Sequence, residues 1–112
     1  LVDTLYISAI TRAEVELGIA LLPEGRRKQQ IADAAQQMFV QLSGRCLVFG
    51  ETAAVHYGQL VAARMRNGRP ITVEDAQIAA IALAGGLRLA TRNEKDFADI
   101  PGLVVVNPWV TH

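Results

Sequence analysis

Two hydrophobic periods alternate along this chain. Short apolar runs, typical of buried strands, separate longer segments in which apolar residues recur every three or four positions, as on one face of a helix. Strands are expected at residues 4–8, 47–49, 87–91 and 103–106. Helices are expected from Thr11 to about Leu22, from Pro23 to about Gly44, and over residues 52–66, 73–84 and 94–97.

Strands that alternate with helices favour a parallel sheet, because parallel neighbours need a crossover connection between them. We therefore expect a single α/β domain over residues 1–112, a sandwich in which a parallel β-sheet is flanked by helices. Ligands bind such sheets beyond the carboxyl ends of the strands. The polar residues that follow the expected strands are the positions to examine for chemistry: Ser8, Thr11, Glu14, Thr91 and Asn93.

The charge of the chain narrows the ways in which it can bind nucleic acid. Eleven basic and eleven acidic residues cancel, so such binding would depend on a local patch and not on the field of the whole protein. Two basic clusters are present, one at residues 26–28 and one formed by Arg64, Arg66 and Arg69. An ordinary solvated helix face or end is the favoured interpretation of each, and a binding patch is the alternative.

The single cysteine, Cys46, indicates the redox state of the compartment in which the protein resides. It excludes an internal disulfide and, without a partner cysteine or histidine, a zinc site, so a reducing compartment fits best. The sequence has no signal-peptide pattern and no apolar run of about 18 residues. We therefore expect a cytoplasmic protein that does not span a membrane.

Three carboxylates occupy positions where apolar packing alone does not require them. Glu14 lies one turn into the first helix, Asp75 in the first turn of an alanine-rich helix, and Asp96 beyond the strand that ends at Thr91. Carboxylates gathered in a cleft repel one another, and a hard divalent cation such as Mg²⁺ or Mn²⁺ relieves that repulsion. If the three converge at one edge of the sheet, metal-assisted phosphodiester hydrolysis follows.

Each carboxylate also has a structural explanation. Thr11 and Glu14 have the spacing of a capping box, as do Thr72 and Asp75, and Asp96 is suited to cap a helix or to pair on the surface. Considered singly, these explanations are favoured, so spacing alone leaves the metal hypothesis weak.

Four stretches in order carry a resemblance: residues 6–19, 71–80, 89–97 and the closing Val106-Asn-Pro-Trp109. Together they resemble the PIN-domain family, in its branch of VapC/FitB-type toxins. The resemblance implies a PIN-like three-layer sandwich and an endoribonuclease dependent on Mg²⁺ or Mn²⁺, the toxin of a type II toxin–antitoxin system. It also implies a homodimer, an RNA substrate and a cognate antitoxin through which the toxin reaches operator DNA.

The family's functional residues carry over position by position. Glu14 matches the glutamate of the first helix and Asp75 the central metal-binding aspartate, while Asn93 and Asp96 are both candidates for the fourth acidic position. Glu14, Asp75 and Asp96 are thus the implied metal ligands. The remaining polar residues are implied to orient phosphate or water or to support the site: Thr91, Ser8 and Thr11.

The chain also departs from the family pattern. Family members begin with a strand that ends in a metal-binding aspartate, and no such segment precedes Leu1; Asp3 lies beyond that position. We therefore expect an N-terminally truncated domain with an incomplete metal site and weak activity. Two alternatives stay open: a non-catalytic module for antitoxin binding or dimerisation, and a metal-free small-molecule binder of flavodoxin-like topology.

Overall fold

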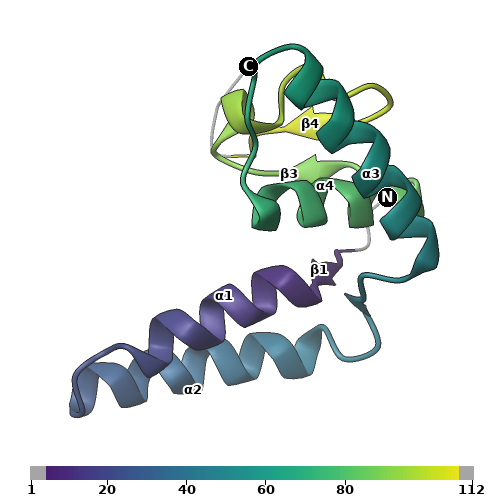
Figure 1. Cartoon of the computed structure of the whole chain (residues 1–112). Helices are drawn as coiled ribbons and strands as arrows, with labels where there is room; N and C mark the ends of the chain where they lie inside the picture. Colours follow the sequence, from purple (N-terminus) through teal and green to yellow (C-terminus); the bar gives the residue numbers. More distant parts are fainter. Residues whose placement is uncertain (1–4, 109–112) are drawn as a thin grey trace. The chain divides into compact units, whose positions relative to one another are not determined.

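The computed structural model describes residues 5–108 (Figure 1). Three residues discussed above, Asp3, Thr4 and Trp109, lie outside the described residues. The chain divides into two compact units, Leu1–Val48 and Phe49–His112. That both units belong to one folding domain stays a prediction, and each unit is described by itself.

The N-terminal unit is a helical hairpin joined at its base by a pair of short strands. Helices α1 and α2 run side by side in opposite directions (Figure 1). The strands β1 and β2 are parallel, with Ile7 opposite Cys46 and Ser8 opposite Leu47. In chain order the elements are β1 (Ile7–Ser8), α1 (Ala9–Ala20), α2 (Arg26–Gln41) and β2 (Cys46–Leu47).

Helix α1 begins two residues earlier than the sequence pattern predicts. Ser8 is the N-cap: its Oγ accepts a hydrogen bond from the Thr11 N–H at 2.9 Å and donates one to Thr11 Oγ1 at 3.0 Å. The prediction that Thr11 caps this helix is therefore wrong, because a serine was available one turn earlier to satisfy a free N–H group. Glu14 consequently lies in the second turn of α1, outside any capping box.

Helix α2 also begins at a different residue from the one expected. Pro23 precedes it, and the N-cap is Gly25, whose φ of 147° lies in a region that favours glycine. Lys28 fixes the connection from inside α2, because its Nζ contacts Glu24 Oε1 at 2.7 Å and the Ala20 carbonyl oxygen at 3.4 Å. The chain therefore needs residues 21–25 to reverse direction before a helix can form.

Phe39 is the buried centre of the N-terminal unit. Its side chain is 7% exposed, and the Arg12 guanidinium lies 4.2 Å from the centre of its ring. This cation–π contact joins α1 to α2, with Arg12 also 3.6 Å from Glu16 in an ion pair on the surface. Large apolar side chains elsewhere in the unit stay exposed, among them Leu17, Leu21 and Val40.

The C-terminal unit packs two helices against each other and adds a second pair of parallel strands. Strand β3 pairs with β4, with Leu89 opposite Val105 and Ala90 opposite Val106. The fully buried alanines 76, 79 and 80 allow α3 and α4 to approach closely. The elements are α3 (Glu51–Arg66), α4 (Val73–Gly85), β3 (Leu89–Ala90), the 3₁₀ helix η1 (Glu94–Phe97) and β4 (Val105–Val106).

The ends of α4 follow the sequence prediction. Thr72 is its N-cap, since its Oγ1 accepts a hydrogen bond from the Asp75 N–H at 3.1 Å. Gly86 ends the helix in the left-handed conformation, at a φ of 64°. These two signals place Asp75 in the first turn of the helix, as expected.

Both strand pairs are parallel, as expected, but in the described residues they form two separate two-stranded sheets, and each strand has only two residues. Hydrogen bonds continue the β3–β4 pairing beyond the strand itself, because the Thr91 N–H donates to the Val106 carbonyl oxygen at 3.0 Å. Within the part of the chain that the structure describes, no helix has the length and apolar character needed to cross a bilayer.

The cap of α1 can be tested with paired substitutions. We expect Ser8→Ala to lower the free energy of unfolding by about 1 kcal/mol, because the Thr11 N–H loses its acceptor. Thr11→Ala should change it by less than about 0.5 kcal/mol, since only the hydroxyl contact is removed and alanine favours helix. Urea unfolding followed by circular dichroism measures both, and an equal loss in the two variants would contradict this helix start.

Candidate functional site

A cleft of about 330 Å³ lies at the start of α4 in the C-terminal unit. Its walls come from the end of α3, the loop between α3 and α4, the first turn of α4, and η1. Asp75 and Asp96, two of the three carboxylates singled out from the sequence, both line it. The full lining consists of Arg64, Arg69, Pro70, Ile71, Thr72, Asp75, Lys95 and Asp96.

Asp75 has an environment that disfavours its charged form. Partial burial raises the pKa of this carboxyl, a hydrogen bond with Thr72 opposes the rise, and the negative charges of Asp96 and Glu74 add to it. The predicted cap at Thr72 is therefore present, but it does not remove the electrostatic cost of the Asp75 carboxylate. A bound cation would offset that cost.

Asp96 lies inside η1, and two backbone N–H groups form the hydrogen bonds that hold the turn before it. Its N–H donates to the Asn93 carbonyl oxygen at 3.1 Å, and the Asn93 N–H donates in turn to Thr91 Oγ1 at 3.1 Å. The Asp96 side chain is exposed and forms no hydrogen bond or ion pair with another residue of the described range 5–108. Of the two candidates for the fourth acidic position, Asp96 lines the cleft with Asp75 and Asn93 does not, and the choice between them stays a prediction.

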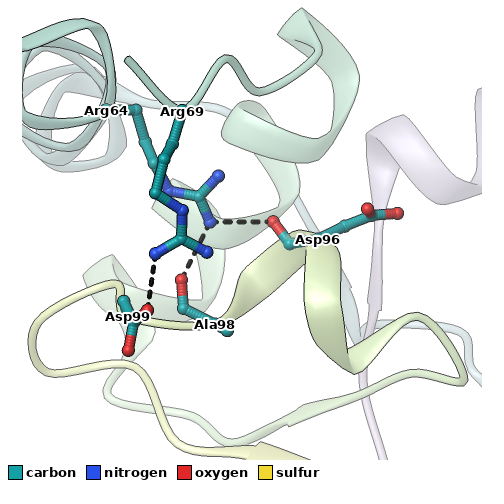
Figure 2. A network of polar contacts seen from close by, with 5 residues as sticks. All are labelled: Arg64, Arg69, Asp96, Ala98 and Asp99. Carbon is teal, nitrogen blue, oxygen red and sulfur yellow. Dashed lines mark hydrogen bonds and ion pairs between the residues drawn. The ribbon is translucent and has the colours of Figure 1, made fainter. Parts of the chain in front are cut away.

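Arg64 is a site residue whose role the sequence interpretation missed. The favoured interpretation, a solvated helix face, is wrong for this residue, because its side chain is 7% exposed. Its Nη2 donates to the carbonyl oxygens of Asp96 and Ala98, each at 2.9 Å (Figure 2). The spacing of the sequence could have indicated this burial, because Arg64 follows the buried Leu60 by four residues and therefore lies on the same helix face.

Arg69, the second cation of the cleft, forms an exposed ion pair, unlike the buried Arg64. Its Nη1 lies 2.5 Å from Asp99 Oδ2 (Figure 2), and the two side chains are 44% and 75% exposed. Asp99 has a φ of 63°, a conformation that aspartate adopts more readily than most residues. An ion pair this exposed contributes little to stability. The predicted cluster of Arg64, Arg66 and Arg69 is therefore not one continuous basic patch.

Three predicted site residues lie in the N-terminal unit. Ser8 and Thr11 are bonded to each other in the cap of α1, and Glu14 is exposed one turn further along that helix. The convergence of Glu14 with Asp75 and Asp96 stays a prediction. Within the described part of either unit, no three histidine, cysteine, aspartate or glutamate side chains gather closely enough to hold a metal ion by themselves.

The donor set of the cleft nevertheless suits a hard cation. Mg²⁺ takes oxygen ligands and is held by one or two carboxylates, with water completing its octahedron. Asp75 and Asp96 offer such oxygens in one cleft, and the raised pKa of Asp75 reflects a partly buried charge in need of compensation. The residues present therefore fit Mg²⁺ or Mn²⁺.

The electrostatic cost at Asp75 can be measured through stability. Because its folded-state pKa is raised, Asp75 stabilises the fold when protonated, and this contribution is lost as the pH rises through that pKa. Without added metal, Asp75→Asn should therefore raise the free energy of unfolding near pH 7, and the gain should vanish toward about pH 4. Urea unfolding across this range tests it against Asp33→Asn, an exposed control; a loss of stability near pH 7 would contradict the assignment.

Sequence comparison identifies relatives along nearly the whole chain. The sequence model of the PIN domain matches residues 1–103. The plasmid stability protein StbB of Pseudomonas syringae pv. tomato is 40% identical over 108 residues, which cover 96% of this chain and 77% of the relative. Toxin FitB of Neisseria gonorrhoeae is 38% identical, with 97% and 78% of the two chains covered.

Solved structures agree with these sequence matches. A chain of FitAB bound to an IR36 DNA fragment superposes with a TM-score of 0.85 and 36% identity, covering 96% of this chain and 75% of that one. A chain of FitAcB from Neisseria gonorrhoeae gives 0.84 and 37%, with 95% and 76% covered. The expected α/β, PIN-like fold is thereby confirmed. The family match, the sequence relatives and the shared fold lead to one conclusion: the chain belongs to the PIN-domain family.

Proposed function

We propose that this chain is a metal-dependent endoribonuclease and the toxin of a type II toxin–antitoxin system. The observation that carries the proposal is the pairing of Asp75 with Asp96 in one cleft, where each lacks a full set of protein partners. A relative in Sinorhizobium fredii, 37% identical over 110 residues that cover 97% of this chain and 78% of the relative, is named VapC ribonuclease Y4jK. Membership of the PIN-domain family supports the same activity.

The proposed cofactor is Mg²⁺ or Mn²⁺, with Asp75, Asp96 and Glu14 as ligands. When bound, such a cation neutralises charge on a scissile phosphate and acidifies a water molecule. Thr91 and Asn93, whose backbone and hydroxyl groups shape the turn before Asp96, are proposed to orient phosphate or water. Ser8 and Thr11 support the site indirectly, by fixing the start of the helix that carries Glu14.

Lys95 and Arg69 give the same cleft a positive component. Both line it beside the two carboxylates. A polyanion such as RNA needs local cations, because the chain as a whole has no net charge. We propose that these two side chains contact the phosphate backbone and carry no base specificity.

The proposed protein partners are a cognate antitoxin and a second copy of the chain, with DNA reached only through the antitoxin. Solved structures of similar proteins include FitAB on a DNA fragment. Exposed apolar side chains four residues apart near the end of α1 support a protein-binding surface: Leu17 is 60% exposed and Leu21 75%. Cytoplasmic localisation stays a prediction.

Metal binding is the first test. Calorimetric titration with Mn²⁺ should show binding by the wild-type chain and at least about tenfold weaker binding by Asp75→Asn and by Asp96→Asn, because each removes one of few ligands. Glu14→Gln should weaken binding similarly if the predicted convergence holds. Glu16→Gln is the matched control, an exposed glutamate on the same helix, and should bind as the wild type does.

Ribonuclease activity is the second test. Cleavage of single-stranded RNA should require Mg²⁺ or Mn²⁺, stop on chelation, and fall at least about a hundredfold in Asp75→Asn, since metal activation contributes several kcal/mol to such reactions. Cleavage that survives both chelation and Asp75→Asn would contradict the proposal. Binding of an antitoxin with neither Mn²⁺ binding nor cleavage would favour the non-catalytic module instead.

A further inference from the structure

Arg64 is a buried cation that no carboxylate neutralises within the described residues. Its side chain is 7% exposed, and its Nη2 donates to two backbone carbonyl oxygens, those of Asp96 and Ala98 (Figure 2). Its Nε is buried and has no hydrogen-bond partner within residues 5–108. Such an arrangement costs stability, because a guanidinium taken out of water regains only part of its hydrogen bonding.

Packing alone does not explain an arginine at this position. A buried ionic group can often be replaced by an apolar side chain of similar volume without loss of stability. What an arginine adds here is a donor that holds two carbonyl groups at once. These carbonyls flank Phe97, which is itself buried, so one side chain fixes the backbone on both sides of a core residue.

The segment held in this way is otherwise restrained by local hydrogen bonds before Asp96 and by the burial of Phe97. It is a single turn of 3₁₀ helix, a form with poor hydrogen-bond geometry, and the bond from the Ala98 N–H to the Lys95 carbonyl oxygen is long at 3.4 Å. Asp96 belongs to this turn and projects an exposed carboxylate from it. The two bonds from Arg64 tie this turn, and with it the backbone of Asp96, to the end of α3.

Arg64 also connects to the segment that carries the other carboxylate. Its own carbonyl oxygen accepts a hydrogen bond from the Arg69 N–H at 2.9 Å, which closes the loop leading to Thr72 and Asp75. A single residue at the end of α3 thus links the backbone on both sides of the cleft. No direct bond between the Asp75 and Asp96 carboxylates fixes their relative position.

We infer that Arg64 is a positioning residue for the metal site: it holds the turn of Asp96 against the loop of Asp75 so that both carboxylates reach one cation. The inference rests on the proposed metal-dependent function. Arg64 touches neither metal nor substrate in this role, and it acts through the backbone of Asp96. Removing a group that orients a metal ligand without touching the metal commonly lowers metal affinity by about ten- to a hundredfold.

The direction in which Mn²⁺ affinity changes when the charge of Arg64 is removed distinguishes a positioning role from a purely electrostatic one. If Arg64 acted only as a nearby positive charge, Arg64→Met would remove repulsion and tighten Mn²⁺ binding. If Arg64 positions Asp96, the same substitution should weaken Mn²⁺ binding about tenfold in calorimetric titration. Arg66→Met is the matched control, since it removes an exposed cation near the end of the same helix that does not line the cleft, and it should leave Mn²⁺ binding within about twofold.

Arg64→Lys keeps the charge and tests geometry alone. Its shorter ammonium group should recover part of the affinity lost in Arg64→Met, and it serves as the deciding variant if Arg64→Met does not fold. Hydrogen exchange at the Asp96 and Ala98 amides gives a readout that needs no metal, and both should exchange faster in either Arg64 variant. Mn²⁺ affinity equal to the wild type in a folded Arg64 variant would overturn the inference.

The failure of the inference and of the proposed function can be told apart. If the wild-type chain and Asp75→Asn both fail to bind Mn²⁺, the metal-dependent function is wrong, and the exchange rates alone decide whether Arg64 holds the turn. If the wild type binds and Asp75→Asn does not, the metal site stands. An Arg64→Met that then binds Mn²⁺ as tightly as the wild type would reject the positioning role by itself.

Discussion

The close packing of α3 on α4 is the constraint on which the candidate site depends. Alanines 76, 79 and 80 have no side chain beyond Cβ, so the two helices approach closely and their connecting loop is short. The end of α3 and the start of α4 therefore meet at one place. Arg64 reaches that place from one helix and Asp75 from the other, and a larger residue at any of the three alanines would separate them.

Local signals predicted much of this architecture. Helices expected over residues 52–66 and 73–84 are present as α3 and α4, Thr72 caps α4 as its spacing from Asp75 indicates, and the 3₁₀ turn at Glu94–Phe97 appears where a helix was expected. Each of these signals acts through the backbone within a few residues. An N-cap satisfies a free N–H group, and a left-handed glycine allows the last carbonyl groups to be satisfied, so both mark helix ends without help from distant residues.

Where two local signals competed, the sequence did not decide between them. Ser8 and Thr11 are both good N-caps, and the helix begins at the earlier one. Pro23 is a good first helical residue, but the hairpin needs the following residues for its turn. The burial of Arg64 was harder to foresee, because charge composition suggested an exposed cluster and only the four-residue spacing from Leu60 indicated the apolar face. The placement of Asp75 beside Asp96 was expected, whereas the cations around them were not recognised as part of the same site.

The site combines groups whose charge or burial lowers the stability of the fold. Two carboxylates share a cleft, one of them with a raised pKa, and a buried guanidinium nearby has an unsatisfied nitrogen. Features of this kind lower stability and persist in sites where chemistry or binding requires them. The apolar core of the same unit, built from alanine, leucine, isoleucine and phenylalanine, shows no comparable conflict in its described residues.

The helical hairpin has a thermodynamic consequence of its own. Phe39 is the one large apolar side chain that is buried in the described part of that unit, so few contacts would be lost if the hairpin opened. Regions with sparse burial open at a lower free energy than the rest of a protein. A partner that binds only the closed hairpin shifts this equilibrium by mass action. The lifetime of the chain against proteolysis would then depend on the concentration of its partner, and a fall in that concentration would shorten it.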